Sequence, residues 1–298
     1  MKLERCPLFG KCGGCALDFA DPDYRAQKEK LLSGVLPDEI IWISDLRRRA
    51  EFAFLDGQVG FFARASNDII EIPKCPLFDD SINSVLADLR NIPFSGAGRV
   101  LVTKCDNGIA IDFNSAMQFY PPEIKNLNVA RISWNGKIVI EHIVPTVLGH
   151  TFLPNGFLQA TIESQNIMRD FVAQNAAGKI VDLFCGLGTL TIGLKADGFD
   201  TFDSGYVKVR DLFKKPLSVK ELAKYDTVVI DPPRGGAKEQ CTGIAKIPGK
   251  KIIYISCNPG TWMRDKKILE SGGYKCERVI AMDQFIGTRH WELMSVFV

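Results

Sequence analysis

The sequence predicts a two-domain protein of the α/β class, with a β-rich amino-terminal domain followed by a parallel sheet that helices cover on both faces. Its 298 residues are an ordinary length for two domains. From about residue 165, strand-like runs that are apolar nearly throughout alternate with helical segments, which is typical of a buried parallel sheet. These runs lie at residues 179–184, 227–230, 251–256 and 293–298. We expect the domains to comprise residues 1–160 and 161–298.

The amino-terminal domain is predicted from shorter strand-like runs. Residues 51–55 and 59–62 flank Asp56-Gly57, a pair typical of a tight hairpin. A helix is expected from Asp21-Pro22 to about Leu36, because Asp is a good N-cap and Pro suits the first helical position. A second helix is expected at 79–90 and further strands at 99–102, 108–113 and 137–140.

Composition limits the partners and the location. The 37 Lys+Arg and 35 Asp+Glu leave a net charge of +2, too small by itself to indicate a nucleic acid. No stretch has the roughly 18 consecutive apolar residues of a membrane span, so no membrane partner is expected. The first ten residues lack the apolar core of a secretory signal, which predicts a cytoplasmic location. In that reducing compartment the nine cysteines are expected to bind metal, act in catalysis or be buried.

Four of these cysteines form a candidate metal site. Cys6, Cys12 and Cys15 make a C-x5-C-x2-C pattern on a glycine-containing loop, and Cys75 lies far downstream in Pro73-Lys-Cys-Pro. Four thiolates suit a [4Fe-4S] cluster, and they suit a structural zinc ion equally well. The spacing leaves both possibilities open.

A glycine loop follows the strand at 179–184. Gly186 and Gly188 allow the backbone to approach a bound ligand closely, and the alternative is a tight turn that binds nothing. The loop lacks the Lys-Ser/Thr of a P-loop and the third glycine of the dinucleotide fingerprint. Its D-x-F-x-G-x-G pattern resembles the first motif of S-adenosylmethionine methyltransferases. An acidic residue ending the next strand is expected to hold ribose hydroxyls, and Asp203 is the candidate.

Two candidate catalytic residues lie near later strands. Asp231-Pro-Pro-Arg-Gly-Gly and Ser256-Cys257-Asn-Pro follow predicted parallel strands, whose carboxyl ends bind ligands in open α/β sheets. Cys257 also precedes a predicted helix, a position that lowers the pKa of a thiol. Glu292 enters the last strand from Thr288-x-His290-x-Glu292. The plainer alternatives are a buried structural cysteine and a surface glutamate.

Together these segments resemble the RNA uracil-5-methyltransferase family, which joins DPPRxG, SCNPxT and DxFPxTxHxE. The resemblance runs from Cys6 to the carboxyl terminus and implies a Rossmann-like class I methyltransferase sheet. It implies that Cys257 is the nucleophile, that Glu292 is the base and that S-adenosylmethionine is the cofactor. The residues implied to contact the cofactor, beside the two glycines of the loop, are Gln159, Phe184, Thr189, Asp203 and Asp231.

The same resemblance bears on the cysteines and on the substrate. Ribosomal-RNA members of the family carry an iron-sulfur cluster on C-x5-C-G-G-C with a distant C-P-L, which favours [4Fe-4S] over zinc and 23S rRNA as the partner. Transfer-RNA members characteristically lack this cluster, so transfer RNA is the alternative substrate. A cytosine-5-methyltransferase is disfavoured because its proline-cysteine and glutamate-asparagine-valine motifs are missing. No obligate protein partner is predicted.

The implied chemistry explains the residue types. Uracil C5 is a poor nucleophile, so a thiolate adds to C6 and the resulting enolate takes the methyl group at C5. A base then removes the C5 proton, and Glu292 suits this step if burial raises its pKa towards neutrality. His290 is expected to be structural or to contact RNA. The target uridine must leave its stack, which favours one in a loop.

An RNA-binding patch is one interpretation of the arginines at 47–49. With Phe52, Phe54, Phe61, Phe62 and Arg64 they place basic charge near aromatic rings, which can hold phosphates and stack bases. The alternative is a solvated turn beside ordinary core phenylalanines.

The chain departs from the family pattern at three places. Ile286 replaces a proline, and we expect no oligonucleotide-binding extension before the cysteines. Only Ser204-Gly205-Tyr206 separates Asp203 from the next strand-like run, Val207–Asp211, whereas parallel strands need a crossover of a dozen or more residues. We therefore expect one strand to be absent or the pairing to be rearranged, which bears on Asp203 and Asp211. An RNA-binding iron-sulfur relic with impaired catalysis is a further alternative.

Overall fold

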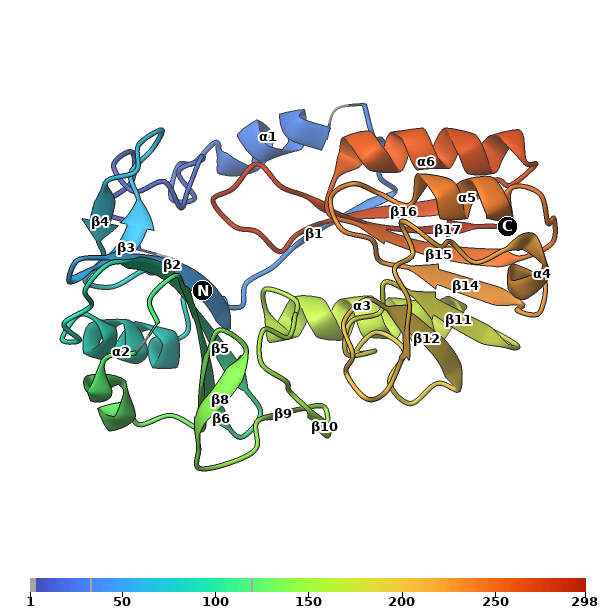
Figure 1. Ribbon diagram of the computed structural model, residues 1–298. Helices are drawn as coiled ribbons and strands as arrows, with labels where there is room; N and C mark the ends of the chain where they lie inside the picture. Colours follow the sequence, from blue (N-terminus) through green and yellow to red (C-terminus); the bar gives the residue numbers. More distant parts are fainter. Residues whose placement is uncertain (1–3, 33, 119) are drawn as a thin grey trace. The chain divides into compact units, whose positions relative to one another are not determined.

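The computed structural model describes residues 4–32, 34–118 and 120–298 and divides the chain into two compact units (Figure 1). The β-rich unit comprises the chain up to Gln27, Ser44–Ile162 and Ile286–Arg289. The parallel-sheet unit comprises Lys28–Ile43, Glu163–Phe285 and His290–Val298. The expected division was a single cut between residues 160 and 161. The units of the structure are instead interleaved, because an early and a late segment each belong to the other unit.

The parallel-sheet unit contains eight strands in the order β1-β16-β17-β15-β14-β11-β12-β13. Neighbours are parallel except β17, which is antiparallel to both β15 and β16. Every residue of β11, β14 and β17 is buried, as expected of a sheet covered on both faces. The strands are β1 (Glu39–Trp42), β11 (Ile180–Leu183), β12 (Ala196–Asp200), β13 (Lys208–Val209), β14 (Thr227–Ile230), β15 (Lys251–Ser256), β16 (Cys276–Asp283) and β17 (Glu292–Phe297).

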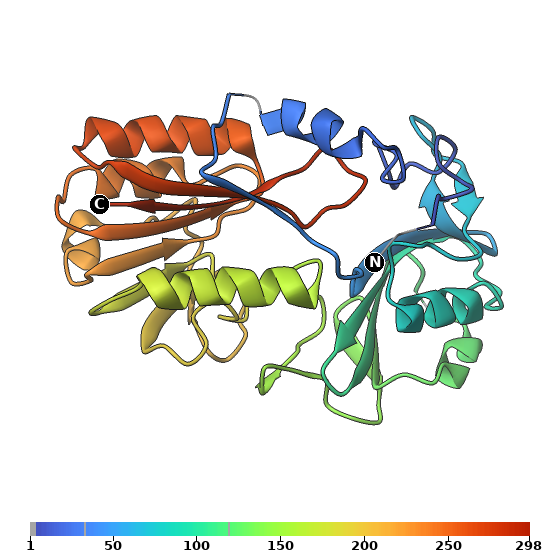
Figure 2. The ribbon, with the colours of Figure 1, turned by 180° about the vertical axis from the view of Figure 1, so that it is seen from behind.

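Helices cover both faces of this sheet, which confirms the expected α/β architecture. Along β15, Ile252 and Tyr254 contribute to one apolar core and Ile253 and Ile255 to the other, the alternation that a strand imposes. Helix α3 lies on one face, and α5 and α6 lie on the other, as Figures 1 and 2 show from opposite sides. The helices are α3 (Ile162–Asn175), α4 (Val219–Leu222), α5 (Lys238–Ile244) and α6 (Pro259–Ser271).

The connections between β11, β12 and β13 are short. Between residues 184 and 207, all of which the structure describes, no helix is present. Both strands nevertheless form, and β13 pairs with β12 in parallel over only two residues. The expectation of an absent strand or a rearranged pairing was therefore wrong. Exposed apolar side chains, Tyr206, Val209 and Phe213, accompany this uncovered edge.

The β-rich unit is built on a seven-stranded sheet in the order β4-β3-β2-β5-β6-β7-β8. The predicted hairpin is confirmed, because Asp56 and Gly57 have φ angles of 43° and 87° and Leu55 pairs with Gln58. The strands are β2 (Arg49–Leu55), β3 (Gln58–Phe62), β4 (Ile69–Glu71), β5 (Ala97–Cys105), β6 (Gly108–Ser115), β7 (Arg131–Trp134) and β8 (Lys137–Glu141), with a separate hairpin of β9 (Thr146–Val147) and β10 (His150–Thr151).

The helices outside the parallel sheet are short. The expected helix at 79–90 is confirmed as α2 (Asp80–Leu89), with Asp79 as its N-cap. The helix expected from residue 21 to 36 is shorter, because α1 (Tyr24–Glu29) passes into the 3-10 turn η1 (Lys30–Leu32). A second 3-10 turn is η2 (Pro122–Asn126). None of the helices in the described ranges combines the length and hydropathy that crossing a bilayer requires.

Phe52 and Phe54 belong to the core of the β-rich unit. They are 0% and 1% exposed and share a core with residues of α2. The ring of Phe52 contacts Phe61 and Phe78, and that of Phe54 contacts Phe94 and Phe113. Neither ring is available to stack a base, so the predicted role of these two aromatics was wrong and the core interpretation is confirmed. A strand that alternates its side chains between two faces buries alternate positions, and only the fold shows which face is covered.

Candidate functional site

The four candidate ligand cysteines line one cavity of the β-rich unit. Cys6, Cys12, Cys15 and Cys75 surround a volume of about 150 Å³. Burial raises the pKa of Cys15 to about 11 and that of Cys75 to about 12. No group of three or more possible ligands among the described residues is arranged closely enough to hold a metal ion. The fold therefore gathers the four sulfurs at one cavity without forming a closed coordination site.

Neighbouring backbone holds the cysteine loop in place. The N–H of Gly13 donates to the carbonyl of Phe62, and Asn83 accepts from the N–H of Cys75 at 2.8 Å. Gly287 has a φ of +78°, and a Cβ there would lie 2.8 Å from the sulfur of Cys15. A side chain at this position would be strained by the backbone and would collide with Cys15, so glycine allows the segment Ile286–Arg289 to lie against the cysteine loop.

The glycine loop follows β11 in the parallel-sheet unit. Gly186 and Gly188 have φ angles of +54° and +71°, and a Cβ built on either meets no atom within 4 Å. Phe184 adopts a φ of +63°, a conformation that non-glycine residues rarely take and that is concentrated at functional sites. Thr189 is buried in the same turn. The loop thus presents an open side at the carboxyl end of β11, where a ligand can approach the backbone.

Asp200, which sequence reasoning missed, is the acidic residue that ends β12. Its Oδ2 accepts a hydrogen bond of 2.9 Å from the N–H of Gly186. Asp203 does not end the strand, as was expected, but lies in the following turn and accepts from the N–H of Gly205. Placing the end of this strand at residue 200 in the sequence would have identified Asp200 as the acidic residue at the strand end.

Asp182 is a completely buried carboxyl group within β11. Thr191 Oγ1 donates to its Oδ2 at 2.7 Å. Burial, with a smaller repulsion from Asp200, raises the pKa of Asp182 to about 7. The folded protein therefore holds this proton more tightly than the unfolded chain does.

We expect Asp182→Asn to remove a pH dependence of stability. Because the folded pKa is about 7 and the unfolded value about 3.9, the free energy of unfolding should fall as pH rises between these values, by on the order of 4 kcal/mol, and stay level above. Urea unfolding from pH 4 to pH 8 measures this slope. The exposed Asp203→Asn is the control and should keep it. An unchanged slope in Asp182→Asn would contradict the assignment.

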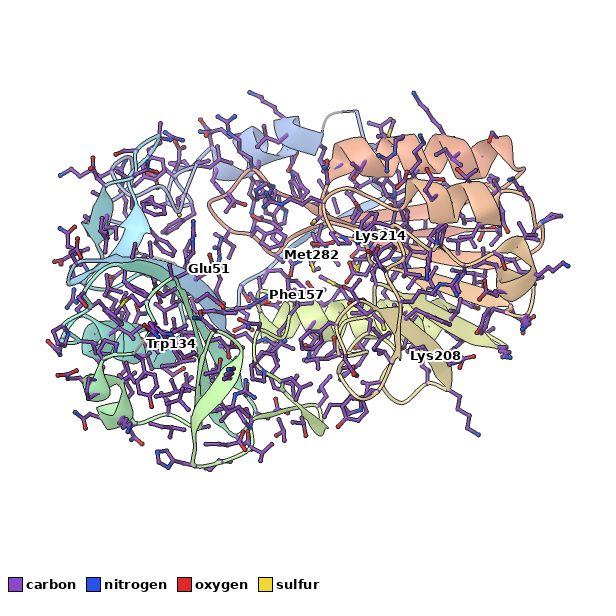
Figure 3. All side chains as sticks on the ribbon, viewed as in Figure 1. Glu51, Trp134, Phe157, Lys208, Lys214 and Met282 are labelled. Atoms are coloured by element: carbon purple, nitrogen blue, oxygen red, sulfur yellow. The ribbon has the colours of Figure 1, made fainter. Side chains whose placement is uncertain are left out.

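Asp231, Cys257 and Glu292 come together at one end of the parallel sheet. Asp231 follows β14, Cys257 follows β15, and Glu292 is the first residue of β17. Ser256 pairs with Leu293, so Cys257 and Glu292 extend from adjacent strands. On the other side of β17, the register partner of Glu292 is Met282, which Figure 3 labels on β16. Asp231, Cys257 and Glu292 therefore share one end of three neighbouring strands, β14, β15 and β17.

The electrostatics of Cys257 differ from expectation. Burial, followed by Glu292 and Asp231, raises the pKa of its thiol to about 12, and Arg234 lowers it by less. The prediction that a helix N-terminus lowers this pKa was wrong, because desolvation and two carboxyl groups outweigh α6. Glu292 is 3% exposed, and burial together with Asp231 raises its pKa well above the usual value. Cys257 thus rests as a thiol at neutral pH, with a buried carboxyl group beside it.

Hydrogen bonds, two of them buried, connect the two candidate catalytic loops. Asp265 on α6 accepts from the hydroxyl of Tyr254 at 2.6 Å and from the N–H of Ala237 at 2.7 Å. Asn258 caps α6 and donates through its amide to the carbonyl of Arg234. These bonds connect the loop after Asp231 with the loop after β15. The buried partners of Asp265 could be found only from the fold.

The other sequence candidates lie as follows. Arg234 Nη2 is 3.1 Å from His290 Nε2 in the parallel-sheet unit. Gln159 belongs to the β-rich unit, where its side chain is buried and its carbonyl accepts from Arg48. Ile286, which replaces the family's proline, is buried in the β-rich unit and accepts from Arg47 through its carbonyl.

A parallel sheet with a glycine turn after a central strand, and with reactive side chains at its carboxyl end, defines a class I methyltransferase-like fold. The chain is similar, with a TM-score of 0.78 and 23% identity, to the structure of a tRNA (uracil-54, C5)-methyltransferase of Pyrococcus abyssi, over 98% of this chain and 86% of that one. Residues 199–297 match the tRNA (Uracil-5-)-methyltransferase family.

Sequence comparison extends the match to the whole chain. An uncharacterized RNA methyltransferase of Brucella suis is 33% identical over 98% of this chain and 83% of its own length. A 23S rRNA (uracil(1939)-C(5))-methyltransferase of Shewanella halifaxensis is 26% identical over 98% and 81%. The chain belongs to the RNA uracil-5-methyltransferase family and is an RNA methyltransferase.

Proposed function

We propose that this RNA methyltransferase transfers a methyl group from S-adenosylmethionine to C5 of a uridine in 23S rRNA. The observation that carries the proposal is the meeting of Cys257, Glu292 and Asp231 at one end of the sheet. The ribosomal substrate is supported by the similarity to the Shewanella relative and by the four cysteines at one cavity. Transfer RNA is the alternative, since the Pyrococcus structure is that of a tRNA enzyme.

The chain's own residues account for the covalent steps. Cys257 loses its thiol proton to solvent water, its thiolate forms a bond to uracil C6, and the electrons of the C5–C6 double bond move to give an enolate that is nucleophilic at C5. S-Adenosylmethionine, when bound, supplies the electrophilic methyl group. Glu292 in its ionised form then takes the C5 proton, and the electrons of that bond restore the C5–C6 double bond as the C–S bond breaks. Burial raises the pKa of the Cys257 thiol to about 12 and also raises that of Glu292, so the buried site disfavours charge on both groups before RNA binds.

The cofactor residues remain those predicted, with one addition. Gly186 and Gly188 leave open space beside the backbone, and Phe184 and Thr189 belong to the same turn. Asp231, Asp203 and Gln159 complete the predicted set, and Asp200 joins it because it holds the glycine loop. The short connections beyond β12 favour a second candidate, an RNA-binding relic that no longer binds the cofactor. Calorimetry with S-adenosylhomocysteine separates these, since a relic gives no binding heat.

The cysteine cavity is proposed to hold a [4Fe-4S] cluster through Cys6, Cys12, Cys15 and Cys75. The donor set fits, because four sulfurs line one cavity and an iron cluster is held by four cysteine thiolates. The four cysteines would hold the cluster as thiolates, and the amino-terminal loop would thereby be cross-linked to Cys75 in the β-rich unit. Zinc, which also accepts four thiolates, is the competitor.

We expect Cys75→Ser to lose the cluster. Removing one of four thiolates should reduce iron and acid-labile sulfide in anaerobically purified protein from about four per chain to below one. Iron, sulfide and zinc assays measure this directly. Cys276→Ser is the matched control, because Cys276 begins β16 in the other unit. Stoichiometric zinc without sulfide in the unsubstituted protein would contradict the cluster.

The first experiment on the proposed function is methyl transfer from labelled S-adenosylmethionine to unmodified bulk RNA. Nucleoside analysis of the separated ribosomal and transfer fractions should find 5-methyluridine in 23S rRNA. Label found only in transfer RNA would mean that transfer RNA, and not 23S rRNA, is the substrate. Full activity of Cys257→Ala would overturn the mechanism. No transfer, from protein with an intact cluster and RNA that a control enzyme modifies, would favour the relic.

A further inference from the structure

Gln284 is a buried side chain that contacts the proposed base and that the steps derived above do not use. It is 1% exposed and follows the last residue of β16. Its Nε2 donates to Oε2 of Glu292 at 2.6 Å. A short hydrogen bond between two buried side chains is strong when one partner is ionised. The contact therefore depends on the protonation state of Glu292.

The backbone on both sides of Gln284 is anchored by one lysine. Lys28 is completely buried, and its ammonium donates to Asp283 at 2.7 Å and to the carbonyl of Phe285 at 3.2 Å. Met282, just before, is paired with Glu292 in the sheet. Because the residues before and after it are held, the amide of Gln284 is directed at the carboxyl group rather than free to turn away.

The groups that face Glu292 act in opposite directions. Desolvation and the charge of Asp231, at the end of β14, favour its protonated form. The hydrogen bond from Gln284 favours the carboxylate. The charged form of Glu292 disfavours the thiolate of Cys257, after β15, and the positive charge of Arg234 favours that thiolate. The amide of Gln284 is thus the neighbouring side chain that donates a hydrogen bond to the form able to accept a proton.

We propose that Gln284 is a positioning residue that orients the Glu292 carboxylate for removal of the C5 proton and favours its ionised form through the hydrogen bond of 2.6 Å. This role rests on the proposed function. In that step the C5–H bond breaks, the proton goes to Glu292, the electron pair forms the C5–C6 double bond, and the C6–S pair returns to Cys257. Gln284 therefore affects the rate at which the covalent RNA–protein adduct is resolved. The addition of Cys257 and the methyl transfer come earlier and do not depend on it.

The test compares Gln284→Met with Gln240→Met, the same change at a buried glutamine on α5, which carries no candidate catalytic residue. Adduct formed with labelled cofactor is followed on denaturing gels from pH 6 to pH 9. For Gln284→Met we expect resolution of the adduct at pH 7 to be about 10- to 100-fold slower, because one hydrogen bond to a charged group is lost. We also expect the midpoint of the curve of resolution rate against pH to shift to higher pH. An unshifted midpoint, or equal slowing at every pH, would overturn the role.

A second measurement needs neither RNA nor cofactor. Since charged Glu292 raises the pKa of Cys257, keeping Glu292 protonated should speed alkylation of Cys257 by iodoacetamide near neutral pH. Peptide mass spectrometry should find faster alkylation at Cys257 in Gln284→Met than in the unsubstituted protein or Gln240→Met. Equal rates overturn the link between Gln284 and Glu292. Failure of the unsubstituted enzyme to methylate RNA instead overturns the proposed function, so the two failures are distinguishable.

Discussion

Glu292→Gln is expected to convert the enzyme from a turnover catalyst into one that reacts once and stays attached to its RNA. Glutamine has the same shape but cannot accept the C5 proton, so methylation should proceed and release of Cys257 should not. Turnover should fall by about 10²- to 10⁴-fold, the usual contribution of a positioned general base. Folding should be preserved, because the site already disfavours the charged form of Glu292.

The measurement is a denaturing gel with labelled RNA and labelled cofactor. A band carrying both protein and methylated RNA should accumulate in Glu292→Gln and be absent in Cys257→Ala. Glu270→Gln is the matched control, since Glu270 is exposed on α6 and pairs only at the surface with Lys266. Release of free methylated RNA at the unsubstituted rate would contradict the role of Glu292.

Lys28→Met is expected to be the most destabilising of the substitutions considered. Lys28 and Asp283 form an ion pair with side chains 0% and 2% exposed, and methionine would leave the carboxylate buried without its cation. Breaking such a pair typically costs about 3 to 5 kcal/mol. The indole N–H of Trp291 also donates to the Lys28 carbonyl, so the segment is held by backbone as well.

Urea unfolding at neutral pH measures this loss. The control is Lys30→Met, because Lys30 is exposed two residues away and should change the free energy of unfolding by less than about 0.5 kcal/mol. Restoration of stability by the double variant Lys28→Met with Asp283→Leu would support the ion-pair explanation, since two apolar groups leave no buried charge. Equal effects of the two lysine variants would contradict it.

Sequence reasoning located the elements whose signals are local. The runs at 227–230 and 251–256 are apolar nearly throughout, as the strands of a parallel sheet covered on both faces are, and both form strands. The Asp56-Gly57 hairpin was likewise predictable from the backbone preferences of two residues. The candidate residues at the carboxyl ends of the strands follow from the same logic, since a parallel sheet brings those ends together.

The remaining features depend on neighbours that are distant in sequence. The sequence around Phe52 and Phe54 does not distinguish them from exposed aromatic residues. They are buried because α2 covers the face of the sheet on which they lie. The pKa of Cys257 follows from burial and from carboxyl groups on two other strands, so position before a helix predicted the wrong direction. The sequence gives no sign that Gln284 has a role. It lies against Glu292 because β16 pairs with β17.

Strand β1 has a consequence for how the chain can be made. It pairs with β16, with Glu39 beside Ile280, so an edge of the sheet is supplied by a segment that leaves the ribosome early. Strand β1 cannot pair until β16, near the carboxyl terminus, has been synthesised. A fragment starting at residue 161 would leave β16 with unpaired backbone groups, a template for aggregation. Expression of the parallel-sheet unit alone therefore requires residues 28–43, joined by circular permutation or supplied as a separate peptide.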